Sequence, residues 1–261
     1  MRNIAALALC ASAFLLPLDR ALAQENRDFR VRLGLGAQIV PKYIGADSSE
    51  WAPLLGLSFA RGDKPFKWGA PDDSAGIALI SAGGFDVGPA ANIAGSRKES
   101  DVGVPVGRVR TTIEAGGFVQ YRAGDSFRIR GELLKGLGGH DGIVGSLGAD
   151  YILRNGDLYD WSIGPRILFS NARYQRAYFG VTPEAALASG LPAYRPGSGV
   201  HALGATTAGH YRLGGPWGLF GFARYERLVG DAAKSPIVGE FGSRNQYSAG
   251  AGVTYTFVIK R

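Results

Sequence analysis

The sequence has little of the chemistry that holds small exported proteins or metal centres together. Among 261 residues it contains one cysteine, Cys10, and three histidines. Because Cys10 lies in an N-terminal segment that we expect to be removed, the mature chain has no disulfide and no thiolate metal site. No stretch beyond that segment reaches the roughly 20 apolar residues that a transmembrane helix needs. These absences exclude a disulfide scaffold and a helical membrane protein.

Residues 1–23 have the features of a secretory signal peptide. Arg2 gives a positive start, residues 4–16 form an apolar run, and Ala21, Leu22 and Ala23 make the small-x-small pattern that signal peptidase recognises. We therefore predict cleavage after Ala23 and one mature domain over residues 24–261. The whole chain carries a net charge of +7, but an exported protein rarely meets nucleic acid. We expect no nucleic-acid partner.

Alternation of apolar and polar residues dominates the rest of the chain. Forty glycines and many aromatic residues disfavour a helical protein. In residues 29–39 every odd position is apolar, whereas the even positions hold arginine, glycine and glutamine. This two-residue period is that of a β-strand, and the sequence therefore predicts an all-β protein. The period recurs over residues 109–122, 127–133, 143–154, 159–170 and 246–257.

Two architectures use such strands, a soluble sandwich and a lipid-facing barrel. Arginines mixed with acids on the polar faces, aromatic residues near strand ends and alternating short and long connections favour the barrel. We predict a closed antiparallel transmembrane β-barrel of about twelve strands in the bacterial outer membrane. Closure requires residues 29–39 to pair with residues 244–257. An even strand number requires residues 65–82 to split into two strands around an outer hairpin at 70–74.

The polar faces of these strands are predicted to line the barrel interior. Two interpretations remain open. Fixed positive charge could give a weakly anion-preferring channel, or arginine–carboxylate pairs could fill a narrow barrel as a plug. The predicted lumen-lining charged residues are Arg30, Arg32, Arg110, Glu114, Arg122, Arg128, Arg130, Glu132, Asp150, Asp160, Arg166, Arg212, Arg224 and Glu226.

Candidate catalytic and metal-binding residues are sparse. Ser198 and His201 lie close in sequence, as in rim hydrolases, but no nucleophile elbow or paired-acid spacing accompanies them. His140 and His210 stand alone. The loop aspartates match no calcium-binding spacing; they are Asp47, Asp72, Asp73 and Asp231. We predict that the protein is not an enzyme and holds no metal or cofactor.

The longest connection, residues 171–198, contains the signals of a short helix. Thr182 can cap its N-terminus, Pro183 suits the first helical position, and Gly190 can end it. We expect this helix in a long extracellular loop, where it either packs over the barrel mouth or presents a surface.

Three loop blocks carry a family resemblance. They read PKYIGAD at 41–47, YFGVT at 178–182 with SGLPAY at 189–194, and GDAAKSPIV at 230–238 with GSRNQ at 242–246. With these blocks the chain resembles the MipA/OmpV family of outer-membrane proteins. The resemblance implies a monomeric barrel in outer-membrane lipid that acts as a scaffold for murein-processing enzymes, with a lytic transglycosylase and a penicillin-binding murein synthase as partners. It also leaves open adhesion or passage of small solutes.

Overall fold

The computed structural model describes residues 28–260, so the predicted signal peptide lies outside the described residues. Short helices occupy the connections at one end. Within the described part of the chain, no helix is long and apolar enough to cross a membrane. The elements are β1 (Phe29–Pro41), β2 (Ser49–Arg61), β3 (Ala75–Gly76), β4 (Ile80–Ala82), β5 (Phe85–Ala94), α1 (Glu99–Val102), β6 (Thr112–Ala123), β7 (Phe127–Leu137), β8 (Ile143–Asn155), β9 (Tyr159–Ser170), α2 (Ala172–Phe179), α3 (Pro183–Ser189), β10 (Gly199–Gly214), β11 (Trp217–Leu228), α4 (Gly230–Ala233), α5 (Pro236–Phe241) and β12 (Asn245–Ile259).

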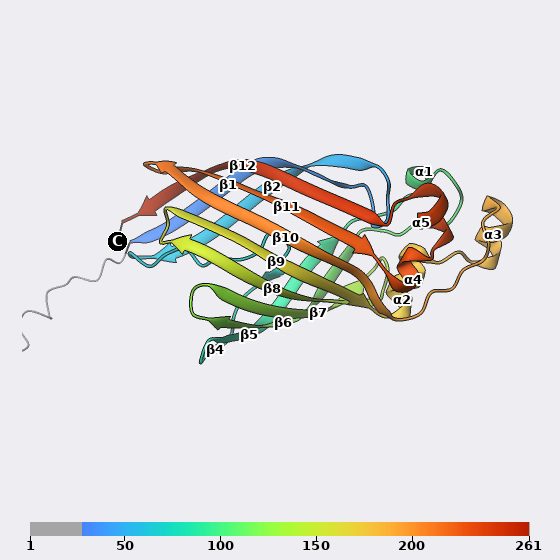
Figure 1. The fold of residues 1–261 in the computed structure, drawn as a ribbon, viewed down its shortest axis with the longest axis horizontal. Coiled ribbons are helices and arrows are strands. Elements are labelled where there is room, and N and C mark those ends of the chain that lie inside the picture. The colour runs from blue at the N-terminus through green and yellow to red at the C-terminus, as the bar shows by residue number, and fades with distance from the viewer. Residues whose placement is uncertain (1–27, 261) are drawn as a thin grey trace, which may run out of the picture.

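The strands form a single sheet that curls into a barrel-shaped wall (Figure 1). Its order is β2-β1-β12-β11-β10-β9-β8-β7-β6-β5-β3, with β4 also on β5. Neighbouring strands are antiparallel, as predicted. The predicted pairing of the first strand with the last is confirmed, because Phe29 pairs with Ile259 and Ile39 with Ala249.

The ring of hydrogen bonds is incomplete at one place, which we call the seam. Within residues 28–260, β2 pairs only with β1, and β3 and β4 pair only with β5. The N–H groups of Ile77 and Leu79 also donate to β5, so residues 75–82 form one irregular edge. The predicted complete ring is therefore not found. Residues 62–74, which were expected to supply a further strand and an outer hairpin, leave the wall.

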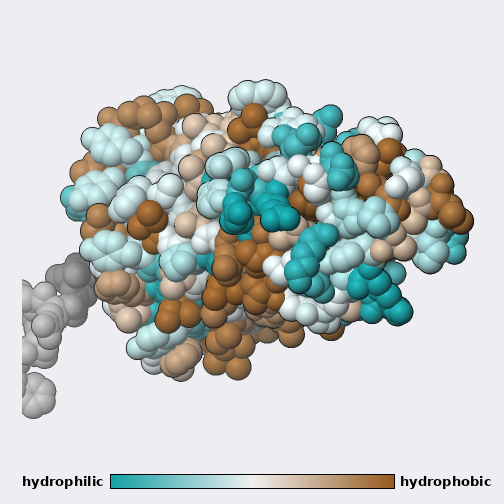
Figure 2. Space-filling model, turned by 45° about the vertical axis from the view of Figure 1, so that its right-hand side comes forward, coloured by the Kyte–Doolittle hydropathy of each residue, from teal (hydrophilic) through white to brown (hydrophobic). Residues whose placement is uncertain are grey.

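The two faces of the wall have opposite chemistry. In β7, Ile129 and Leu133 are 53% and 55% exposed, whereas Arg130 and Glu132 between them are each 8% exposed. Figure 2 shows hydrophobic residues gathered over the middle of the molecule and many hydrophilic ones toward the end that carries the helices. This inverted distribution suits a wall whose outer face contacts lipid and whose inner face is enclosed.

The helices cover one end of the barrel, and we call this assembly the cap (Figure 1). Phe179, Leu228 and Ile237 are almost fully buried within it. The helix predicted in the longest connection is present as α3. As expected, the Thr182 side chain accepts a hydrogen bond from Ala185 N, and Gly190 ends the helix in the left-handed region with a φ of 78°. The opposite end has short turns and both described chain ends.

Because the outer face is assigned to lipid, a charge placed on it at the depth of the membrane core should destabilise the protein. Leu133→Arg should lower the free energy of unfolding in lipid vesicles by about 2–4 kcal/mol, because arginine near the membrane midplane loses its hydration. The control is Leu187→Arg on α3, where the leucine is 90% exposed outside the wall. Urea titration of the refolded proteins measures both changes, and an equal effect of the two substitutions would contradict the assignment.

Candidate functional site

Residues 62–74, here called the inserted segment, run through the barrel interior. The sequence favours this departure from the wall, since Pro65 and Pro71 cannot donate to a β-ladder and Gly69 weakens a strand. Phe66 and Trp68 are nonetheless buried, at 3% and 7% exposure. A segment without strand pairing can bury these rings only against the inner faces of the surrounding strands.

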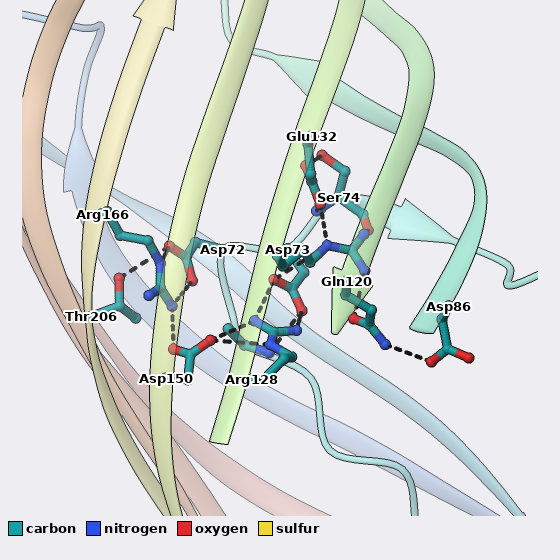
Figure 3. A network of polar contacts seen from close by, with 12 residues as sticks. Asp72, Asp73, Ser74, Asp86, Gln120, Arg128, Glu132, Asp150, Arg166 and Thr206 are labelled. Carbon is teal, nitrogen blue, oxygen red and sulfur yellow. Dashed lines mark hydrogen bonds and ion pairs between the residues drawn. The ribbon is translucent and has the colours of Figure 1, made fainter. Parts of the chain in front are cut away.

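A network of ion pairs fixes the far end of the inserted segment (Figure 3). Arg166 donates from Nε to Asp72 Oδ2 at 2.6 Å and from Nη2 to Asp150 Oδ1 at 2.8 Å. Arg128 donates from Nη2 to Asp73 Oδ1 at 2.9 Å and to Asp150 Oδ2 at 2.8 Å. Asp150 therefore joins two arginines, and each arginine also holds one aspartate of the inserted segment. β7, β8 and β9 are tied to that segment by this network.

Neighbouring contacts extend this network along the wall. Ser74 Oγ donates to Glu132 Oε2 at 2.6 Å, and Arg130 Nε donates to Glu132 Oε1 at the same distance. Thr206 on β10 donates to Asp72 at 3.1 Å. Figure 3 shows these side chains converging from several strands. The inserted segment is thus bonded to the inner faces of β7, β9 and β10.

The near end of the inserted segment is held by aromatic and backbone contacts. The Arg32 guanidinium lies over the Phe66 ring, 4.0 Å from its centroid, and Arg128 lies over Trp68 at 4.5 Å. Asp157 Oδ1 accepts from Phe66 N at 2.9 Å, while its other oxygen accepts from Arg30 at 2.8 Å. The attraction between a cation and an aromatic face is stronger where water is excluded.

Most of the predicted lumen residues lie on the inner face. Arg212 is also on that face but is exposed at the end with the short turns. The assignment of Arg110 is wrong: it precedes β6 and is exposed, whereas Val109 is 4% exposed inside the cap. The predicted alternation includes residue 110, but β6 begins only at Thr112. The other predicted residues lie on the inner face; they are Arg30, Arg32, Glu114, Arg122, Arg128, Arg130, Glu132, Asp150, Asp160, Arg166, Arg224 and Glu226.

The main residues that the sequence interpretation missed belong to the inserted segment. Asp72 and Asp73 were placed in an outer loop, but they are partners of wall arginines inside the barrel. The excess of arginine over carboxylate on the predicted inner face was a signal that further acids were required. Their identity depended on contacts between positions as far apart as Asp72 and Arg166, 94 residues along the chain.

The three family blocks meet in the cap. Gln246 donates to Ala46 O at 2.9 Å, and Ser235 donates to Phe179 O at 2.7 Å. Tyr194 donates to Asp231 O at 2.9 Å. The blocks therefore form one hydrogen-bonded unit that covers the mouth.

A buried arginine and tyrosine anchor the loop before β6 to this unit. Arg97 is 1% exposed and donates to the carbonyl oxygens of Tyr178, Val106 and Gly107. Burial raises the pKa of Tyr178 to about 12, so its hydroxyl stays neutral and donates to Gly95 O at 3.2 Å. The contacts of Arg97 and Tyr178 with backbone carbonyls thus keep their charge state in the physiological pH range.

The histidines have structural partners. His140 is 2% exposed and bonds Glu114 at 2.9 Å, and His201 bonds Ser170 at 3.1 Å. Ser198 instead accepts from the backbone of Ala172. The Ser198 and His201 side chains are thus engaged with different partners. Among residues 28–260, no group of three or more His, Cys, Asp or Glu side chains is arranged to hold a metal ion.

An amphipathic antiparallel wall, a charged interior and short turns at one end define a β-barrel protein of the outer-membrane type. A family model described as "MltA-interacting protein MipA" matches residues 33–257. Because the match covers most of the chain, this protein belongs to the MipA family, as the loop blocks predicted.

Other comparisons are more distant, and no curated protein matches this chain. An outer-membrane channel from Pseudomonas putida F1 is 10% identical, with 92% of this chain and 99% of that chain covered and a TM-score of 0.40. OprG from Pseudomonas aeruginosa is 11% identical, with 89% and 97% covered and a TM-score of 0.26. The translocator domain of the autotransporter NalP from Neisseria meningitidis is 12% identical, with 91% of each chain covered and a TM-score of 0.30.

The bridging role of Asp150 gives a stability prediction. Asp150→Asn should lower the free energy of unfolding by about 3–5 kcal/mol, because it leaves buried arginines without full compensation. Asp125→Asn, in the exposed turn between β6 and β7, is the matched control. Urea-induced unfolding in vesicles measures the difference. An Asp150 variant as stable as the control would show that the network contributes no net stability.

Proposed function

We propose that this protein is a monomeric, occluded outer-membrane barrel that serves as a docking platform for murein-processing enzymes. The observation that carries the proposal is the inserted segment, bonded across the lumen through Asp72 and Asp73. An interior crossed by an ion-paired segment and covered by a cap is suited to rigidity. The family description, which names an interaction with MltA, supports a murein enzyme as the partner.

Loop lengths support an orientation. Barrels of this type have short periplasmic turns and longer extracellular loops. The end with the described chain ends has short turns, such as those after β6 and β8, whereas the cap contains the long helical connections. We therefore assign the cap to the cell exterior and the other end, here called the rim, to the periplasm. The export signal predicted over residues 1–23 agrees with this location.

An occluded lumen should conduct no ions. The purified protein in a planar bilayer should show no steady conductance, whereas Asp72→Asn combined with Asp73→Asn should open an anion-preferring one, because the freed arginines raise the local anion concentration. The control is Asp125→Asn, which leaves the inserted segment unchanged. Steady conductance of the unaltered protein would refute occlusion and favour the alternative, a narrow channel for small anions.

The rim offers a basic surface for a periplasmic partner. The exposed basic residues there include Arg61, Lys64, Arg212 and Lys260, and the exposed acidic residues include Asp63 and Asp125. Complementary charge mainly accelerates association and is weakened by salt. A murein enzyme with an acidic face fits this surface.

The docking proposal predicts binding of a lytic transglycosylase to the barrel in nanodiscs. Arg61→Glu combined with Lys64→Glu should slow association about tenfold at low ionic strength. Arg173→Glu combined with Arg176→Glu, on the exposed side of α2 in the cap, should leave the rate unchanged. Surface plasmon resonance gives the rates. Absence of binding by the unaltered barrel, or equal loss in both double variants, would count against docking at the rim.

A further inference from the structure

A cavity of about 840 Å³ lies between the inserted segment and the wall and extends to the seam. Its lining includes Leu55 and Leu57 of β2 and, on the opposite side of the seam, Ile77. These side chains are 73%, 61% and 71% exposed, so they also belong to the outer surface. A cavity lined by lipid-facing residues from both sides of the seam is continuous with the hydrocarbon region of the membrane.

The inner wall of this cavity contains three phenylalanines where the alternation calls for polar residues. Phe118 on β6 and Phe220 and Phe222 on β11 all line it. Phe220 faces inward, since its ring lies 3.1 Å from the position of a Cβ on Gly34 of the inner face. Other parts of the inner face carry ion-paired side chains such as Arg128, Asp150 and Arg166. An aromatic wall beside an unfilled space provides a surface for an alkyl chain.

One part of the cavity is lined by basic side chains with two carboxylates near them: Asp86 acts electrostatically on Arg122, and Asp160 on Arg32. The basic residues are Arg32, Arg122 and His210. Each has a buried ring or guanidinium nitrogen without a hydrogen-bond partner in the described part of the chain: Nε of the two arginines and Nδ1 of the histidine. Arg128 and Arg166, in contrast, have two carboxylates each. The buried Nε–H donors of Arg32 and Arg122 require an acceptor, whereas the role of His210 Nδ1 depends on the tautomer of the ring.

We propose that this cavity binds a single-chain amphiphile with an anionic head group, which enters from the membrane through the seam. The head-group oxygens accept hydrogen bonds from Arg32 and Arg122, and the chain lies along Phe118 and Phe220 toward Leu57. The cavity volume falls within the range of roughly 300–1,000 Å³ for sites that bind small molecules. This binding site is independent of the docking function proposed above.

The test uses the full barrel in phosphatidylcholine nanodiscs with isotope-labelled dodecanoate as the probe. Dodecanoate should bind saturably with a stoichiometry of one, and about tenfold more tightly than dodecanol, because the alcohol lacks a charge for the arginines. Arg32→Gln should remove that preference for the carboxylate, whereas Arg173→Gln on α2 should retain it.

Access and volume are tested by a matched pair of glycine substitutions. A Cβ on Gly56 points into the cavity, 3.9 Å from the Phe220 ring, so Gly56→Leu should reduce dodecanoate binding at least about tenfold by filling the space. Gly131→Leu adds the same group on the outer face beside Leu147 and should have no effect. Heat-modified electrophoretic mobility confirms that both variants are folded. Binding no greater than in empty nanodiscs, equal binding of dodecanoate and dodecanol, or equal loss in both glycine variants would overturn the proposal.

Discussion

The ion pairs between the inserted segment and the wall are the interaction on which the rest of this structure depends. Two adjacent aspartates, Asp72 and Asp73, meet arginines from two different strands in a space shielded from water, where opposite charges attract strongly and unpaired ones are unfavourable. The same contacts hold a segment inside the lumen, compensate wall charges and withdraw a length of chain from the sheet. The proposed occlusion and the seam therefore have one cause.

The sequence was informative wherever one face of a strand had a uniform environment. Period-two alternation predicted the inner and outer faces from β6 to β9, and the expected closure of the barrel predicted the pairing of β1 with β12. In the inserted segment, the strand expected from an even strand number is absent: Phe66, Trp68 and Ala70 alternate like a strand but bury their side chains inside the barrel. Alternation reports which side chains avoid water, and this criterion cannot distinguish a wall strand from an extended segment within the lumen.

Departures from the pattern contained the remaining signals. Phe118, Phe220 and Phe222 stand at positions of the sequence where the alternation calls for polar residues, and in the structure they line the cavity beside the inserted segment. The partners in the cap could not be derived from local pattern, since Gln246 and Ala46 are 200 positions apart. The loop blocks indicated instead, through their family resemblance, that these distant segments belong together, and their hydrogen bonds show how.

The direction of the strands beside the seam has a topological consequence. β2 runs from the cap to the rim, and so does the edge formed by residues 75–82, because the return path between them lies inside the lumen. If these two edges approached each other, they would meet as parallel neighbours, with slanted hydrogen bonds unlike those of every other pair in the wall. The gap therefore follows from the connectivity of the chain. Thermal fluctuations of the barrel do not supply the antiparallel pairing that the seam lacks.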